Sequence, residues 1–180
     1  LTVVDRPVIQ HVVDEARAAG PEHLIFVTGR GKAVIEDHFD RAYELEATLE
    51  ARGKKAELEI LKAAQPGAGE TSFTRQQSPL GLGHAVWCAR DLVGNEPFAV
   101  LLPDVLVLAK KSCLAQMLDA HAQTGEKSNL IAVEEVAPDQ THQYGVVGMG
   151  AKKGPAFEIT AMVEKPAKGT APSNNIVTGR

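Results

Sequence analysis

Apolar and polar positions along the chain follow two patterns, short apolar runs and stripes at helical spacing. Residues 7–19 carry apolar side chains at helical spacing, between a proline that suits a first helical turn and Gly20, which suits the position after a helix. Residues 24–28 then form a short apolar run that is typical of a buried strand. This alternation of helix and strand continues through the first 135 residues.

The remaining elements follow from the same signals. We expect further helices at residues 33–39, 43–61 with a break or kink at Gly53, 84–91, and 114–124 with a stop at Gly125, and further strands at residues 72–76, 98–102, 130–133, 144–149, 157–163 and 174–178. Alternating strands and helices predict a Rossmann-like α/β fold. In this fold a mostly parallel sheet is covered by helices on both faces, so that helices, sheet and helices form three layers. The strand-rich last third predicts a small antiparallel flap.

Residues 98–102 are expected to form the central strand, because five apolar residues run without a break and then stop at Pro103. Asp104 therefore follows the carboxyl end of this strand, at the edge where open α/β sheets bind ligands. Its carboxylate needs a partner there, either a divalent cation on a phosphate substrate or the N–H groups of a turn or helix that it caps. Its position alone favours neither interpretation.

Composition limits the classes of partner. The chain has 180 residues, 44% of them hydrophobic, and a net charge of −4, which suits one domain and argues against nucleic acid and anionic membranes as partners. It contains no membrane-spanning run or signal peptide, and Cys88 and Cys113 lack metal-ligand spacing, so we expect reduced thiols in a cytoplasmic protein. Because Leu1 is not Met and the chain stops at residues 178–180, before the expected last strand is completed, we also expect a longer protein, truncated here at both ends.

A glycine-rich loop leads from an expected strand, near Gln76, into the helix that starts near His84. Gln76 offers a donor and an acceptor on one amide, which a nucleobase edge requires, and Gly81 would let a flat ring or a phosphate approach the backbone. Glycine-rich turns between strand and helix are common, however, and a histidine such as His84 is more often a structural helix-start residue than a catalytic one. Another glycine turn, residues 29–32, has two cations that could hold an anion or simply connect a strand to a helix.

Glu164 and Lys165 stand together at the end of an expected strand, before Pro166. The carboxylate could accept hydrogen bonds from sugar hydroxyls, and the ammonium could pair with a phosphate. An exposed pair of charges before a proline turn explains the same residues. Gly145, which follows Tyr144, could permit close approach of a ligand or only mark a bulge.

Six strings of residues, occurring in one order, resemble the sugar-nucleotide nucleotidyltransferase family. They are VVDRPVIQHVVDEA, FDRAYELEATLEARGK, RQQSPLGLGHAVWCAR, PFAVLLPDVLV, QYGVVG and VEKPAKGTAPSN. The second string is more similar to the branch of the family that uses UTP than to its thymidylyl and adenylyl relatives. The resemblance extends over essentially the whole chain.

The resemblance implies transfer of a uridylyl group from UTP to glucose 1-phosphate, with release of pyrophosphate, help from Mg²⁺ and no covalent enzyme intermediate. The implied roles are contacts with uracil for Gln76 and Gly81, with the glucose hydroxyls for Gly145 and Glu164, with the sugar phosphate for Lys165, and with Mg²⁺ for Asp104. Asp104 and Lys165 are therefore the expected catalytic residues. The resemblance also implies a homo-oligomer for the full-length protein.

The chain departs from the family pattern at both ends. The family opens with a strand and a glycine-rich loop that wraps the triphosphate, and it has a C-terminal region that supplies a second metal-binding aspartate or a dimer surface. Residues 1–180 correspond to a single catalytic-domain segment between them, and Asn175 stands where an apolar residue is expected. Two alternatives therefore remain, a thymidylyl or adenylyl transferase and a non-catalytic module that binds sugar nucleotides.

Overall fold

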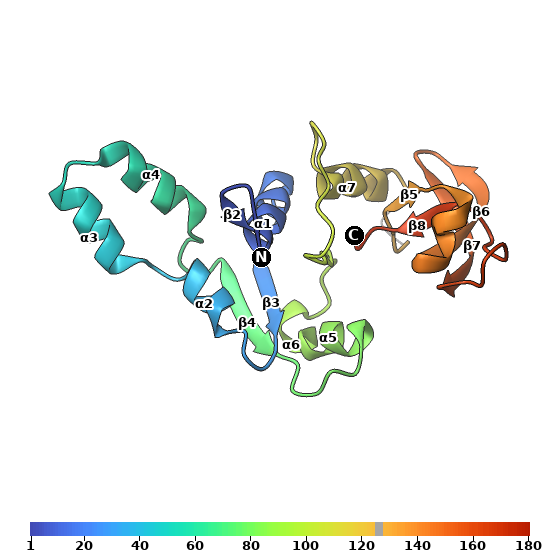
Figure 1. Ribbon diagram of the computed structural model, residues 1–180, viewed down its shortest axis with the longest axis horizontal. Helices are drawn as coiled ribbons and strands as arrows, with labels where there is room; N and C mark the ends of the chain where they lie inside the picture. The colour runs from blue at the N-terminus through green and yellow to red at the C-terminus, as the bar shows by residue number, and fades with distance from the viewer. Residues whose placement is uncertain (125–127) are drawn as a thin grey trace. The chain divides into compact units, whose positions relative to one another are not determined.

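The computed structural model describes residues 1–124 and 128–180 and divides into two units. Unit 1 comprises Leu1–Gly20 and Ala99–Arg180, and unit 2 comprises Pro21–Phe98. Figure 1 shows both units and labels most of their helices and strands. In the described residues, unit 2 holds a two-stranded sheet and unit 1 holds a two-stranded and a four-stranded sheet, so the architecture is mixed α/β with small sheets.

Unit 2 is built around two parallel strands, β3 (Leu24–Thr28) and β4 (Thr71–Arg75), whose register pairs Thr28 with Arg75. Its helices are α2 (Ala33–Phe39), α3 (Tyr43–Ala51), α4 (Lys55–Ala64), α5 (Leu82–Cys88) and α6 (Arg90–Val93). The ring of Phe26 on β3 stacks on Phe73 of β4 and also contacts Phe39 of α2, with both pairs of centroids 4.9 Å apart. These three rings join the strand pair to α2.

In its described residues, unit 1 combines two α-helices with a two-stranded and a four-stranded antiparallel sheet. Its elements are β1 (Thr2–Val3), β2 (Arg6–Pro7), α1 (Val8–Ala19), α7 (Cys113–Gln123), β5 (Val133–Glu135), the 3-10 helix η1 (Pro138–Gln143), β6 (Gly145–Lys153), β7 (Ala156–Glu164) and β8 (Asn175–Val177). The order of the larger sheet is β5-β8-β6-β7, with antiparallel neighbours throughout. Its core includes Val12, Val13 and Leu114, where α1 packs on α7, and Val146, Val147 and Ile176 in the sheet.

Several local predictions are confirmed. Helix α1 ends at Gly20, whose φ of 82° is the left-handed conformation that favours glycine after a helix. The charged stretch 43–61 breaks at Gly53 into α3 and α4, and α5 begins at Leu82, before the expected start at His84. Gly125, the expected stop after α7, lies outside the described residues.

The expectation of a mostly parallel, Rossmann-like sheet with helices on both faces is wrong for the described residues. The parallel strands of the described structure are β3 and β4, whereas the larger sheet is antiparallel. Residues 98–102 form no regular strand, and Phe98 remains 58% exposed. A buried strand needs neighbours on both edges to complete its backbone ladder, and an apolar run cannot supply them by itself.

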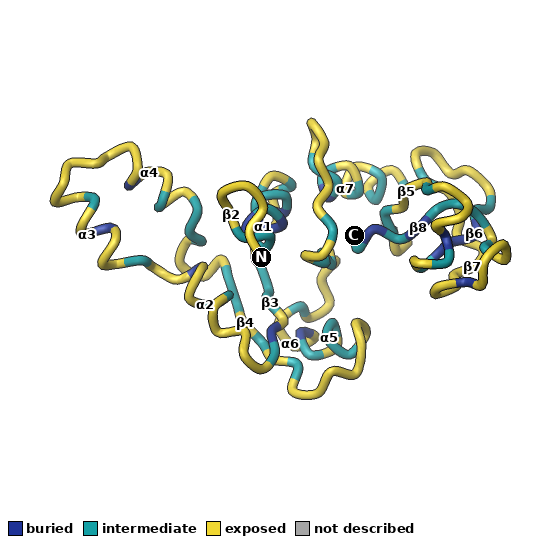
Figure 2. The backbone as a smooth tube through the Cα atoms, in the orientation of Figure 1, coloured by how far each residue is buried: buried dark blue, intermediate teal, exposed yellow. Residues whose placement is uncertain are grey.

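Figure 2 shows buried segments in α1, β6 and β8, while α3 and α4 expose most of their residues. In the described part of the chain, every helix is too short or too polar to cross a membrane. Cys88 and Cys113 are both free, as expected from their spacing.

Candidate functional site

Gln76 and Gly81, the residues implied to contact the base, lie together just after β4. Nε2 of Gln76 donates to the carbonyl of Gly81 at 3.0 Å and lies 3.0 Å from Nδ1 of His84. The backbone N–H of Gln76 donates to the carbonyl of Thr28 at 2.8 Å, so the loops after β3 and β4 share one edge of the strand pair. Within the described part of the chain, Oε1 of Gln76 accepts no hydrogen bond. One hydrogen-bonding atom of this amide is thus free for a ligand.

Gly81 has a φ of 95°, a conformation that residues with a side chain rarely adopt. A Cβ atom at this position would meet nothing within 4 Å, so the space beside the backbone is open. The glycine is therefore required by the turn into α5, and the open space leaves room for a flat ring.

The loop is linked to the only tryptophan of the chain. The His84 ring stacks on Trp87 with centroids 5.9 Å apart, and Cζ of Arg90 lies 3.8 Å from the centre of the Trp87 ring. Because Gln76 contacts His84 in turn, a ligand that moves this amide should change the environment of Trp87. The Trp87 indole can therefore report the binding of a ligand to this loop.

Gly145 and Glu164 are brought together by the antiparallel register of β6 and β7. A Cβ atom at Gly145 would lie 3.0 Å from Oε2 of Glu164 and 3.8 Å from Cγ2 of Val177. The carboxylate therefore uses space that any other residue at position 145 would fill. Glu164 remains exposed, which leaves its oxygens accessible to hydroxyl groups.

Lys165 follows β7 with a φ of 46°, in the left-handed region that residues other than glycine avoid. Its backbone N–H donates to the carbonyl of Tyr144 at 3.0 Å, and the next residue, Pro166, is buried. This conformation costs about 1–2 kcal/mol for an ordinary residue and is most often retained at functional sites. The ammonium makes no ion pair with any described residue, so it is available to an anion.

Asp104 lies in an exposed turn with Pro103, and its side chain has no hydrogen-bond or ion-pair partner among the described residues. The next helix, α7, is capped by Ser112, whose Oγ accepts from the N–H of Ala115 at 3.2 Å. The capping interpretation of Asp104 is therefore wrong. A free carboxylate suits Mg²⁺, which takes one or two carboxylates and completes its shell with phosphate and water oxygens.

The structure joins the predicted residues in groups. Gln76 and Gly81 lie together in unit 2, and Gly145, Glu164 and Lys165 lie together in unit 1. Asp104 belongs to unit 1 but occupies a different turn. Among the residues described, no three His, Cys, Asp or Glu side chains gather as an all-protein metal site.

Sequence reasoning missed Glu15 and Arg180, whose side chains pair at 2.7 Å. The arginine also donates to backbone carbonyls on both sides of the Asp104 turn. No sequence pattern indicates that an arginine after an apolar strand and a glutamate on a distant helix form an ion pair. Only the tertiary structure pairs them, because 165 positions separate the two residues.

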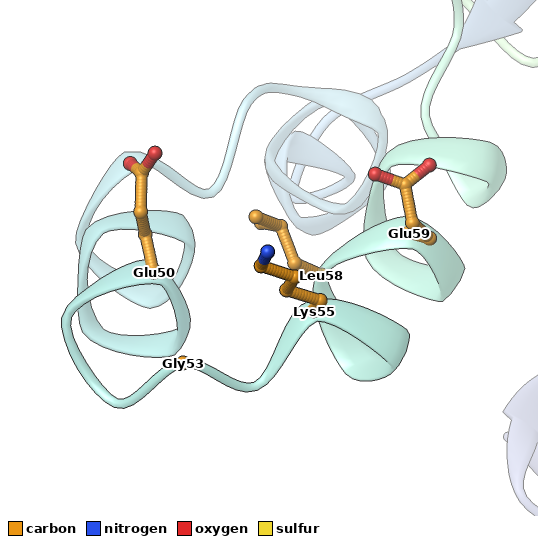
Figure 3. A pocket seen from close by; sticks show the side chains of 5 residues that line it. All are labelled: Glu50, Gly53, Lys55, Leu58 and Glu59. Carbon is orange, nitrogen blue, oxygen red and sulfur yellow. The ribbon is translucent and has the colours of Figure 1, made fainter.

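A surface hollow of about 250 Å³ lies between α3 and α4 (Figure 3). It is lined by Glu50, Gly53, Lys55, Leu58 and Glu59, and it contains none of the predicted site residues. Its mixed charges are typical of a solvated helix surface, so it adds nothing to the candidate site.

Comparison with known proteins supports the resemblance found in the sequence. Two proteins named UTP–glucose-1-phosphate uridylyltransferase, from Bacillus subtilis and Komagataeibacter xylinus, are each 46% identical over 100% of this chain, which covers 61% and 63% of their lengths. A UTP-bound UGPase from Acinetobacter baumannii matches with a TM-score of 0.89 and 43% identity, over 99% of this chain and 64% of that one. A UDP-glucose pyrophosphorylase complexed with UDP-glucose matches with a TM-score of 0.85 and 38% identity, over 100% of this chain and 65% of the other.

These relatives are longer than the chain, which spans about three fifths of the two curated proteins. The model of the nucleotidyl transferase family matches residues 1–180, from the first residue to the last. The expected family is thereby confirmed, and this chain belongs to the nucleotidyl transferase family.

Proposed function

We propose that the protein containing this chain transfers a uridylyl group from UTP to glucose 1-phosphate and so forms UDP-glucose and pyrophosphate. The names of its relatives support this reaction, and similar structures contain UTP or UDP-glucose. The observation that carries the proposal is the end of the β6 and β7 pair. There the Glu164 carboxylate lies over Gly145, and the strained Lys165 follows it.

This arrangement suits a sugar phosphate. The exposed oxygens of Glu164 can accept hydrogen bonds from glucose hydroxyls, and the missing side chain at Gly145 leaves room for this carboxylate at the strand end. Lys165 provides a point charge for the phosphate. A carboxylate next to a cation thus matches the two ends of glucose 1-phosphate.

In unit 2, the loop after β4 provides groups suited to the base of UTP. The free Oε1 of Gln76 can accept the ring N–H of uracil, and the open space at Gly81 accommodates a planar ring. Only one atom of the amide is free, because its NH2 group donates to the carbonyl of Gly81 and also lies within hydrogen-bond distance of Nδ1 of His84. We therefore assign to Gln76 a single direct hydrogen bond to the base.

Asp104 is the residue that we assign to Mg²⁺. When bound, the ion would neutralise charge on the phosphates and on the departing pyrophosphate. Asp104 would hold it through a carboxylate that makes no hydrogen bond or ion pair with the described residues. Its exposure is consistent with a shell that is shared with water and substrate.

The reaction needs no nucleophile from the protein. An oxygen of glucose 1-phosphate forms a bond to the α-phosphorus of UTP, while the bond from that phosphorus to the β-bridging oxygen breaks and its electron pair leaves with pyrophosphate. Lys165 would orient the attacking phosphate and reduce its repulsion by the triphosphate. Such transfers depend mainly on positioning and on charge stabilisation.

The test incubates the full-length protein and Mg²⁺ with glucose 1-phosphate and either UTP, dTTP or ATP, and measures pyrophosphate. We expect the fastest release with UTP. A preference for dTTP or ATP would instead identify a thymidylyl or adenylyl transferase. Binding of UDP-glucose without pyrophosphate release from any nucleotide would identify a non-catalytic module. Homo-oligomerisation remains a prediction, which light scattering on the same protein would test.

A further inference from the structure

Arg180 and Glu15 form a buried ion pair inside unit 1. The arginine side chain is 0% exposed and the glutamate 9%. Nε of Arg180 donates to Oε1 of Glu15 at 3.1 Å, and Nη2 donates to Oε2 at 2.7 Å, which is the two-bond geometry of a strong pair. Oε1 also accepts from the N–H of Leu114 at 3.3 Å, so the carboxylate joins α1 to the first turn of α7.

The same guanidinium holds the backbone on both sides of the Asp104 turn. Nη1 donates to the carbonyl of Leu102 at 2.9 Å, and Nη2 donates to the carbonyl of Val105 at 3.1 Å. The turn itself consists of Pro103 and Asp104, both exposed. Arg180 therefore fixes the residue before the turn and the residue after it.

Gly179 adds a third contact to the same place. Its carbonyl accepts from the N–H of Leu102 at 2.9 Å. A Cβ atom at Gly179 would lie 3.0 Å from Cβ of Leu102, and its φ of 72° also favours glycine. The chain after β8 is thus fitted closely to the segment that ends in Asp104.

Stability alone does not explain this choice of residues, because well-packed apolar residues often replace a buried ion pair without loss. An arginine fork is the side chain that can serve one carboxylate and two separate carbonyls at once. We propose that Glu15 and Arg180 are positioning residues, which fix the Asp104 carboxylate in place for the divalent cation. This inference rests on the metal role that the proposed function gives to Asp104.

The experiment measures Mn²⁺ binding to the full-length protein by electron paramagnetic resonance, with UTP present and glucose 1-phosphate left out. Arg180→Lys keeps the charge but loses the fork, and Glu15→Gln keeps the shape but loses the charge. Both should weaken Mn²⁺ binding about 10- to 100-fold, the usual effect of removing a group that orients a metal ligand. Affinity for UTP without a metal should not change.

Matched controls make the same chemical changes in exposed ion pairs of unit 1. Arg6→Lys alters a residue that pairs with Asp14 at 3.1 Å and is 52% exposed, and Glu158→Gln alters one that pairs with Lys153 at 4.0 Å and is also 52% exposed. Both controls should bind Mn²⁺ as the unchanged protein does. Circular dichroism checks that each variant is folded.

Asp104→Asn separates this inference from the proposed function. If Asp104→Asn binds Mn²⁺ normally, the metal assignment itself fails. If Asp104→Asn loses Mn²⁺ while Arg180→Lys and Glu15→Gln keep it, only the positioning role is overturned. In the double variant Asp104→Asn with Arg180→Lys, we expect no loss beyond that of Asp104→Asn. Unfolding of both single variants would assign the pair to stability and also overturn the positioning role.

Discussion

Oε2 of Glu164 lies 3.0 Å from the point where a side chain at position 145 would place its Cβ atom. Gly145 and Glu164 face each other in the register of β6 and β7, so the sheet itself sets this distance. The absence of a side chain at position 145 therefore determines where the carboxylate lies. Substitution of Gly145 therefore tests the proposed sugar site.

Gly145→Ala should push the Glu164 carboxylate away and raise the KM for glucose 1-phosphate about tenfold, equivalent to about 1.4 kcal/mol, with little effect on the KM for UTP. Glu164→Ala should act in the same direction. If Gly145 acts through Glu164, the double variant should be no worse than Glu164→Ala alone in steady-state kinetics. An effect confined to UTP would mean that sugar and nucleotide are assigned the wrong way round.

Lys165 permits a test that separates backbone strain from charge. Lys165→Ala and Lys165→Gly both remove the ammonium, so both should raise the KM for glucose 1-phosphate more than that for UTP. Only glycine relieves the φ of 46°, so Lys165→Gly should be more stable than Lys165→Ala by about 1 kcal/mol in denaturant unfolding. Equal stabilities would contradict the strain, and unchanged kinetics would contradict the phosphate role.

Gln76→Ala should weaken UTP binding by about 1–3 kcal/mol, because a buried group of the base would lose its partner. The fluorescence of Trp87, which stacks on His84 beside Gln76, provides the titration signal. Gln77→Ala is the matched control, since Gln77 is the next residue and is exposed. The same dissociation constant for both variants would remove Gln76 from the nucleotide site.

Asp104→Asn should lower turnover at least ~10²-fold, the scale of losing one preorganised electrostatic group, and leave the Tm unchanged. The side chain is exposed and makes no contact that stabilises the fold, so only its charge is lost. Asp139→Asn, another exposed aspartate of unit 1, is the control. Near-normal turnover of Asp104→Asn at ordinary Mg²⁺ concentrations would exclude the metal role.

The pair of Arg41 and Glu46 predicts a dependence of stability on pH. Hydrogen bonds from Arg41 at 2.9 and 3.0 Å lower the pKa of Glu46 below its ordinary value of 4.5, against the opposing effect of burial. The folded-state pKa thus lies below the unfolded one. The pair therefore stabilises the fold fully above pH 4.5, and this contribution is lost as the pH falls through the lowered pKa.

Arg41→Gln should accordingly lower the Tm at neutral pH, and its difference from the unchanged protein should shrink in acid. Melting curves between about pH 7 and pH 3 provide the measurement. Arg52→Gln, which changes an arginine at the end of α3, is the control and should give no such convergence. A constant difference across this range would show that Arg41 contributes through packing rather than through the charge of Glu46.

The sequence by itself determined the local elements. The apolar stripe of α1, its end at Gly20, the break at Gly53 and the short strand β3 were all predicted correctly. Each depends on periodicity or on the conformational freedom of one residue, both of which are set by near neighbours in the chain. The motifs also indicated the family, whose model matches all 180 residues.

The tertiary structure decided what depends on residues far apart in sequence. It left residues 98–102 without a full strand ladder, placed the Glu164 carboxylate over Gly145 and turned Lys165 into a left-handed conformation. It also paired Glu15 with Arg180, 165 positions away, around the turn that carries Asp104. Strand pairing and buried ion pairs depend on which distant groups meet in space, and no local pattern of apolar and polar residues encodes that meeting.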